Sequence, residues 1–110
     1  MANGYIPKYS IPERGVIHFD TTNGQEYETV LTYRSGNAQA LFARAIYFSG
    51  RPTGIKVDDV TAGVTIASAE DASAYNKLSV YAVLYPDHEI AIKMKLASNT
   101  GDKTALYTII

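Results

Sequence analysis

The residues best suited to metal or acid–base chemistry are the two histidines, His18 and His88. His18 stands two positions before Asp20, so a β-strand would place both side chains on one face, where both could touch one metal ion. A Zn²⁺ or non-haem iron site needs three or four converging ligands, and His88 could join only if the fold brought distant strands together. The simpler interpretation is that Asp20 begins a turn and His88 ends another, both at sheet edges. The sequence therefore predicts no metal site and no cofactor.

Paired carboxylates are the next candidates for chemistry. Glu26 and Glu28 are two apart and could form an acid–base dyad on one strand face, although a solvated face is the commoner reason for such a pair. Asp58 and Asp59 lack the ligand spacing of a calcium loop. The chain contains neither a G-x-S-x-G nucleophile motif nor a glycine-rich phosphate loop. These observations predict a protein that is not an enzyme and has no catalytic residues.

The composition argues against several classes of partner. The chain of 110 residues contains no cysteine, which rules out disulfides, thiolate metal ligands and cysteine nucleophiles. Its 10 Lys and Arg and its 11 Asp and Glu are scattered, so no basic cluster is present to neutralise phosphates. No apolar run approaches the roughly 20 residues that span a bilayer, and the first residues lack the hydrophobic core of a signal peptide. We therefore expect neither a nucleic acid nor a membrane as partner.

The clearest structural pattern is the stretch HEIAIKMKL, residues 88–96, which alternates strictly. Successive side chains of a β-strand point to opposite faces, so this strand has one apolar and one polar face. An apolar face must be covered by another layer, which predicts a two-layer antiparallel β domain. The apolar side comprises Ile90, Ile92, Met94 and Leu96, and the polar side Glu89, Ala91, Lys93 and Lys95.

Turn signals divide the rest of the chain into short strands. Asn23-Gly24 predicts a hairpin between strands at 15–20 and 25–34. Residues 38–49 fit a helix by their alanine content and a strand by their end, and we favour the strand because both neighbours are strands. Residues 78–85 are apolar on both faces towards their end, which predicts a central strand. Turns at 86–87 and 99–102 then predict a closing meander of three strands.

Together these signals predict an all-β fold. We expect a single antiparallel β-sandwich, of the jelly-roll or Ig-like kind, with about eight short strands, a C-terminal meander and an N-terminal arm. The predicted arm covers residues 1–13 and the predicted sandwich domain covers residues 14–110.

The arm is the predicted partner-binding segment. Pro7 and Pro12 each remove a backbone donor, so this segment cannot be a central strand. The apolar residues between and before the prolines suit a surface that is laid on a neighbour. Arg51, in a loop beside aromatic residues, is a further candidate contact, although a solvated turn residue is the simpler interpretation. The predicted partner-binding residues are Tyr5, Ile6, Tyr9, Ile11 and Arg51.

In general style the chain resembles small virion proteins of tailed bacteriophages, such as capsid-decoration, head-fibre or tail-associated β domains. The arm MANGYIPKYSIPERG and the closing segments KLSVYAVLYPDHEIAIKMKL and TALYTII carry this resemblance. It implies a non-enzymatic structural protein, located in the virion, that binds a capsid or tail lattice through protein–protein contacts as a symmetric homo-oligomer.

A carbohydrate-binding module is the alternative function. Such modules are often β-sandwiches of this size and stack sugars on exposed aromatic rings. The chain has nine tyrosines and no tryptophan, so exposed tyrosines would have to supply those rings.

Overall fold

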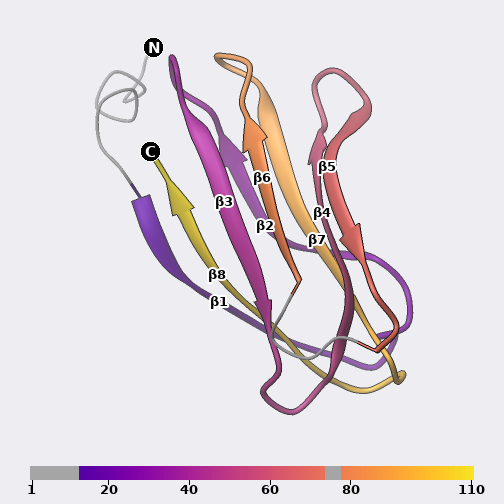
Figure 1. Cartoon of the computed structure of the whole chain (residues 1–110). Coiled ribbons are helices and arrows are strands. Elements are labelled where there is room, and N and C mark those ends of the chain that lie inside the picture. Colours follow the sequence, from indigo (N-terminus) through magenta and orange to yellow (C-terminus); the bar gives the residue numbers. More distant parts are fainter. Residues whose placement is uncertain (1–12, 74–77) are drawn as a thin grey trace.

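The computed structural model describes residues 13–73 and 78–110, which form strands joined by turns and loops (Figure 1). Within these two ranges there are eight strands, and no helix is long and apolar enough to cross a membrane. The predicted all-β class is confirmed, as is the strand within residues 38–49. The strands are β1 (Glu13–Thr21), β2 (Glu28–Arg34), β3 (Ala40–Ile46), β4 (Pro52–Asp59), β5 (Val64–Glu70), β6 (Ser79–Val83), β7 (Glu89–Leu96) and β8 (Gly101–Ile109).

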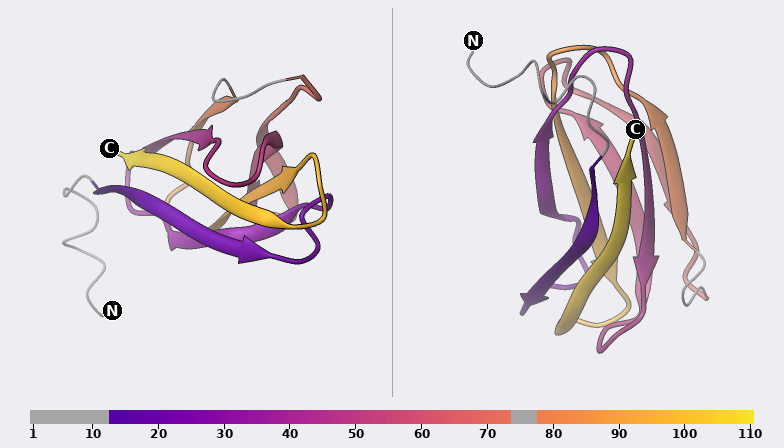
Figure 2. Two further views of the ribbon diagram at one scale, coloured as in Figure 1. Left: turned by 90° about the horizontal axis from the view of Figure 1, so that it is seen from below. Right: turned by 90° about the vertical axis from the view of Figure 1, so that its left-hand side faces the viewer.

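The strands form two four-stranded antiparallel sheets, in the orders β1-β8-β3-β6 and β2-β7-β4-β5. Four of the pairings are nested along the chain, because β4 pairs with β5, β3 with β6, β2 with β7 and β1 with β8. The nested pairs together form one long hairpin whose turn lies between β4 and β5. This hairpin is curled so that its strands form two layers (Figures 1 and 2). This is the jelly-roll topology, one of the two kinds of sandwich that the sequence predicts.

The predicted hairpin and the predicted closing meander are both wrong. β1 and β2 lie in different sheets, and β6, β7 and β8 alternate between the sheets. A strand shows the same alternation of side chains whether its successor pairs beside it or crosses to the other layer. The hydrophobic pattern therefore indicates where a strand lies but not which strand it pairs with.

Gly24, which suggested the hairpin, instead lies where two loops approach each other closely. Its amide donates a hydrogen bond to the carbonyl oxygen of Asn99, and its own carbonyl accepts one from the amide of Leu96. A Cβ atom at this position would clash with the carbonyl oxygen of Ser98. Glycine is required here because a side chain would push the two loops apart.

The prediction of a central strand at 78–85 is also wrong, because β6 lies at the edge of its sheet. Its inward residues Val80 and Ala82 are buried, while Tyr81 and Val83 point outwards and are exposed. The second apolar face of this strand therefore has no covering layer within the described part of the chain.

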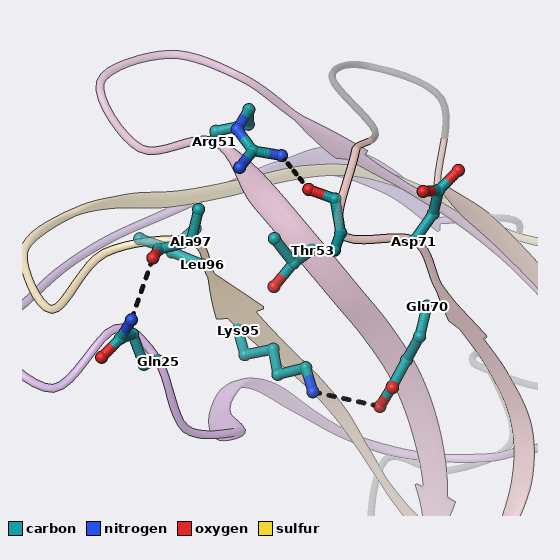
Figure 3. A pocket seen from close by; sticks show the side chains of 9 residues that line it. Gln25, Arg51, Thr53, Glu70, Asp71, Lys95, Leu96 and Ala97 are labelled. Atoms are coloured by element: carbon teal, nitrogen blue, oxygen red, sulfur yellow. Dashed lines mark hydrogen bonds and ion pairs between the residues drawn. The ribbon is translucent and has the colours of Figure 1, made fainter.

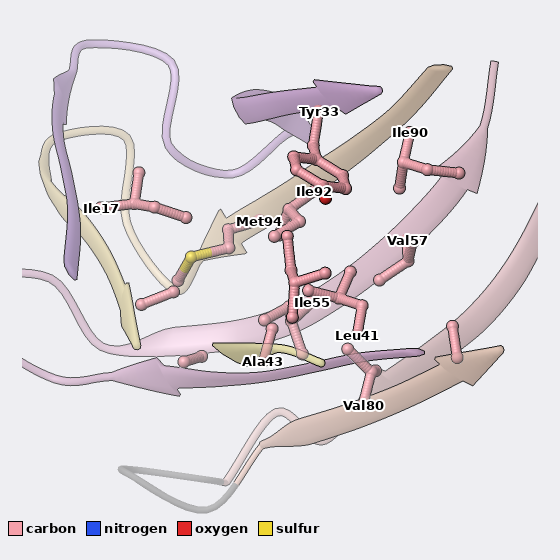
Figure 4. Packing of buried hydrophobic residues seen from close by; sticks show 14 of the residues in the cluster. Ile17, Tyr33, Leu41, Ala43, Ile55, Val57, Val80, Ile90, Ile92 and Met94 are labelled. Atoms are coloured by element: carbon pink, nitrogen blue, oxygen red, sulfur yellow. The ribbon is translucent and has the colours of Figure 1, made fainter. Parts of the chain in front are cut away.

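The core lies between the two sheets and is built from their inward faces. The alternating strand β7 supplies Ile90, Ile92, Met94 and Leu96, each at most 2% exposed, as its pattern predicts. The other sheet contributes the small buried residues Ala43, Ala45 and Ala105 to the core, and Figure 4 shows Ala43 among the larger members of the cluster. Each fully buried large side chain contributes about 1.5–3 kcal/mol to stability, so this layer holds the two sheets together.

One charged side chain crosses the sandwich. Lys103 of β8 is fully buried, and its ammonium group donates hydrogen bonds to the Glu26 carbonyl oxygen, at 3.1 Å, and to the Glu28 carboxylate of the other sheet. Thr21 donates a second hydrogen bond to the same carboxylate, at 2.6 Å. The hydrogen bonds from Lys103 and Thr21 hold the pKa of Glu28 below its ordinary value of 4.5.

We expect Lys103→Met to destabilise the protein by about 2 kcal/mol in urea unfolding at neutral pH, because the Glu26 carbonyl oxygen and the partly exposed Glu28 carboxylate lose their hydrogen-bond donor. The lowered pKa of Glu28 stabilises the folded state fully above pH 4.5, and this contribution is lost as the pH falls through the folded-state pKa. The variant should therefore lose less stability than the wild type when the pH is lowered across this range.

Lys95→Met is the matched control, because Lys95 pairs with the exposed carboxylate of Glu70 on the outer surface. Its unfolding midpoint should stay close to that of the wild type. Equal effects of the two lysine substitutions would contradict a structural role for the buried pair.

Candidate functional site

The outer face of the β2-β7-β4-β5 sheet is covered by ion pairs. The Nζ atom of Lys93 lies 2.8 Å from Oδ2 of Asp58, and that of Lys95 lies 3.3 Å from Oε2 of Glu70. Tyr27 donates its hydroxyl to Glu70 at 2.7 Å, and the Lys95 ammonium lies 5.0 Å from the centre of its ring. Hydrogen bonds from Tyr27 and Lys95 lower the pKa of Glu70. The charges of this face are satisfied within the chain.

The outer face of the β1-β8-β3-β6 sheet exposes several large apolar side chains instead. Six large apolar side chains point away from the core, and their exposed fractions range from 43% to 71%. We call this set the outer apolar face. It consists of Val16, Phe42, Tyr81, Val83, Leu106 and Ile110.

The strand register makes this surface continuous. Phe42 of β3 lies directly opposite Tyr81 of β6, and Val16 of β1 lies directly opposite Leu106 of β8. Val83 stands two positions after Tyr81 and so points to the same side of the sheet. Between β3 and β8 the register places Leu106 opposite Arg44 and Phe42 opposite Thr108, so the two apolar pairs join only along the diagonal from Phe42 to Leu106, with Arg44 at its border.

A continuous apolar patch of this kind is suited to binding another protein. Soluble monomers rarely expose large contiguous apolar surfaces, and the centres of protein interfaces are rich in Tyr, Phe and aliphatic side chains. An open hollow of about 300 Å³ lies beside Val16 and Leu106, and an open surface of this kind suits a macromolecule better than a small substrate.

The structure places Arg51 away from the outer apolar face. It lies in the wall of an open polar hollow of about 500 Å³, where its guanidinium donates a hydrogen bond to the carbonyl oxygen of Ala72 (Figure 3). The other predicted partner-binding residues, Tyr5, Ile6, Tyr9 and Ile11, lie outside the described residues. The hollow is lined by Gln25, Arg51, Thr53, Glu70, Asp71, Ala72, Lys95, Leu96 and Ala97.

The two histidines lie in different sheets and have different surroundings. Nδ1 of His88 lies 2.7 Å from Oδ2 of the fully buried Asp59, whose other oxygen accepts a hydrogen bond from the Ala62 amide at 2.9 Å. Burial alone would raise the pKa of Asp59, but hydrogen bonds from His88 and Ala62 outweigh it, so the pKa is lowered. These contacts tie the β4–β5 turn to the start of β7, which is a structural role.

His18 belongs to a cluster that the sequence did not reveal as a whole. His18 and Asp20 share the outer face of β1 as predicted, and the register of β8 places Asp102 directly opposite Asp20. The hydrogen bond between the two carboxyl groups and the charge of Asp102 raise the pKa of Asp20, while the same hydrogen bond lowers that of Asp102. Among the described residues this is the one group of three His and acidic side chains whose potential ligand atoms all lie within 4.8 Å of one another.

The sequence reasoning also missed the outer apolar face, although it contained a signal for it. The segment LSVYAVLY is apolar at both alternating positions, and this was interpreted as burial on both sides. In the structure one side is covered and the other is exposed, because the described strands form only two layers and β6 faces the other sheet with one side alone. Apolar residues on both faces of a strand therefore indicate either a strand covered by a layer on each side or a strand with one exposed apolar face.

No protein-family model and no curated protein matches this chain. Several solved structures share its fold. The SPBc2 prophage-derived protein YomS matches with a TM-score of 0.58 and 14% identity, over 91% of this chain and 95% of that chain. A chain in the acidic stable capsid structure of Helicobacter pylori bacteriophage KHP30 matches with a TM-score of 0.51 and 13% identity, over 92% and 87% of the two chains.

A third similar structure is that of Bacillus endospore appendages, described as disulfide-linked pili, with a TM-score of 0.51 and 10% identity over 89% of this chain and 85% of that chain. At such low identities the shared feature is the fold. The structural neighbours thus include a prophage protein, a phage capsid structure and a surface appendage, in keeping with the phage-type resemblance seen in the sequence.

Proposed function

We propose that this chain is a non-enzymatic structural protein whose copies assemble through the outer apolar face. The observation that carries the proposal is the contrast between the two outer surfaces. Charged side chains on the outer face of one sheet form ion pairs with one another, while the outer face of the other sheet exposes aromatic and aliphatic side chains. Covering such a patch removes apolar surface from water, which is the main driving force of most protein association.

The fold neighbours support a role in a virion. A capsid structure and a surface appendage are assemblies of many copies, and a prophage protein has the same topology. The endospore pili are disulfide-linked, whereas this chain has no cysteine, so its own contacts cannot be disulfides. We therefore place the protein in a phage particle, as a homo-oligomer bound to a capsid or tail lattice.

The arm is proposed to strengthen this contact. Four apolar residues precede Glu13, where β1 begins at the edge of the sheet that carries the outer apolar face. An arm laid on a neighbouring subunit adds apolar contact without changing the sandwich. The residues proposed for this contact are Tyr5, Ile6, Tyr9 and Ile11, and Arg51 remains a candidate for a separate polar contact.

We expect Val83→Glu and Tyr81→Glu, each tested alone, to weaken self-association at least about tenfold, because the interface would bury an unpaired carboxylate. Sedimentation velocity across a concentration series measures this. Ser68→Glu is the matched control, since Ser68 is exposed on β5, the edge strand of the other sheet. A wild-type chain that stays monomeric at every concentration, or three variants that behave alike, would argue against the proposal.

Replacing Tyr5, Ile6, Tyr9 and Ile11 together by Ser in the full chain should leave the far-ultraviolet circular dichroism and unfolding midpoint of the domain unchanged. The assembled mass measured by light scattering should fall, because the apolar contacts of the arm are lost. Lys8→Ser, in the same segment, is the control and should assemble normally. If the fourfold variant keeps the wild-type mass and partner binding, the arm has no role in assembly.

A carbohydrate-binding function is the second candidate, and exposed tyrosine rings favour it. Tyr47, Tyr81 and Tyr85 are 45%, 62% and 64% exposed. Tyr27 is less suited to stacking a sugar, because two lysine ammonium groups, of Lys56 and Lys95, lie within 5.0 Å of its ring centre. A glycan array separates the two functions: binding that is abolished by Tyr81→Ala alone, in a chain that does not self-associate, would favour the carbohydrate module.

A further inference from the structure

A cluster of three ionisable side chains lies on the same sheet, at the end of β1 and the beginning of β8. His18 and Asp20 come from β1 and Asp102 from β8, and one ligand atom from each residue lies within 4.8 Å of the others. Carboxylates directly opposite each other in an antiparallel pair repel. The placement of Asp20 opposite Asp102 is therefore more stable when a positive group lies between them.

Asp102 provides the second, independent observation. Its side chain is only 7% exposed, and its Oδ1 atom has no hydrogen-bond partner. The loop after β3 covers it: the Ser49 hydroxyl accepts a hydrogen bond from the Asp102 amide at 3.0 Å, and the backbone of Gly50 packs against Gly101. A buried carboxylate oxygen without a partner is costly, and this one points towards the cluster.

His18 is oriented so that one ring nitrogen faces the carboxylates. Its Nδ1 atom lies 3.4 Å from the Thr104 hydroxyl, and its Nε2 atom lies 3.6 Å from Oδ1 of Asp102. The imidazole also makes an edge-to-face contact with the Phe48 ring, with 5.9 Å between the ring centroids. Metal-binding histidines commonly use the second nitrogen for such a hydrogen bond, which leaves the first free to bind the ion.

We propose that His18, Asp20 and Asp102 form a binding site for a divalent transition-metal ion of the Zn²⁺ type. One imidazole nitrogen and two carboxylate oxygens suit Zn²⁺ better than Ca²⁺ or Mg²⁺, which prefer oxygen ligands alone. Ligand atoms around tetrahedral Zn²⁺ lie roughly 3.4 Å apart, so the cluster must contract, and the exposed side chains of His18 and Asp20 can rotate to do this.

The bound ion would fasten the edge strand β1 to β8 and satisfy the buried oxygen of Asp102. Three protein ligands leave at least one coordination position for water, on the side where the His18 side chain is 54% exposed. The competing explanation is that a proton alone, on His18 or shared by the two carboxyl groups, balances the charges. The two explanations differ in their response to added metal.

The test is a titration of the metal-free full chain with ZnCl₂, followed by NMR of the histidine ring protons. The ring signals of His18 should shift and saturate at one equivalent, while those of His88 stay fixed, because His88 is bound to Asp59 in the other sheet. His88 thus serves as an internal control. Parallel shifts of both histidines, or no shift up to a large excess of Zn²⁺, would overturn the proposal.

Two variants assign the ligands by a second measurement. Zn²⁺ should raise the thermal unfolding midpoint of the wild type, because it binds only the folded state, and should fail to raise that of His18→Ala or Asp102→Asn. Asp102→Asn keeps the size of the side chain and removes the repulsion from Asp20, so it is expected to fold. Asp58→Asn, on the opposite outer face, is the matched control and should keep the full shift. Retention of the shift in Asp102→Asn would refute the site.

Discussion

The pairing of β1 with β8 is the constraint on which the surface features depend. It runs without interruption from Glu13 opposite Ile109 to Thr21 opposite Gly101. β8 also pairs with β3, so this register aligns the whole sheet. A slip of β1 by one residue against β8 would turn Val16 inwards and the core residue Ile17 outwards. The same slip would separate Asp20 from Asp102.

The sandwich divides its exterior into two surfaces of different chemistry. Because successive side chains of a strand point to opposite faces, each strand contributes one set of side chains to the core and the other set to the outer surface. The outward side chains of β7 include Lys93 and Lys95, which form ion pairs with Asp58 of β4 and Glu70 of β5. These charges are therefore paired within the chain. In β3 and β6 the outer set includes Phe42 and Tyr81, which nothing in the described chain covers.

Local patterns predict the strands of this chain better than their partners. The alternation at 88–96 identified the core residues Ile90 and Met94 because the period of a strand is a local property. The hairpin at Asn23-Gly24 and the closing meander failed because turn residues do not specify whether the next strand stays in the sheet. The His18 and Asp20 pair was visible from spacing, whereas Asp102 lies 82 positions beyond Asp20 and joins them only through the β1–β8 pairing. Its burial depends on the loop at Ser49, which no local pattern reveals.

The β1–β8 pairing also determines how the domain responds to force. The start of β1 and the end of β8 lie side by side at the same end of the sheet, as Figure 2 shows. A pull on the two ends of the domain therefore acts across the strands and separates them one residue pair at a time. A load applied through the broad faces acts on all the rows of the sheet at once. Contacts made through the broad faces of the domain would not load the β1–β8 pair in this way.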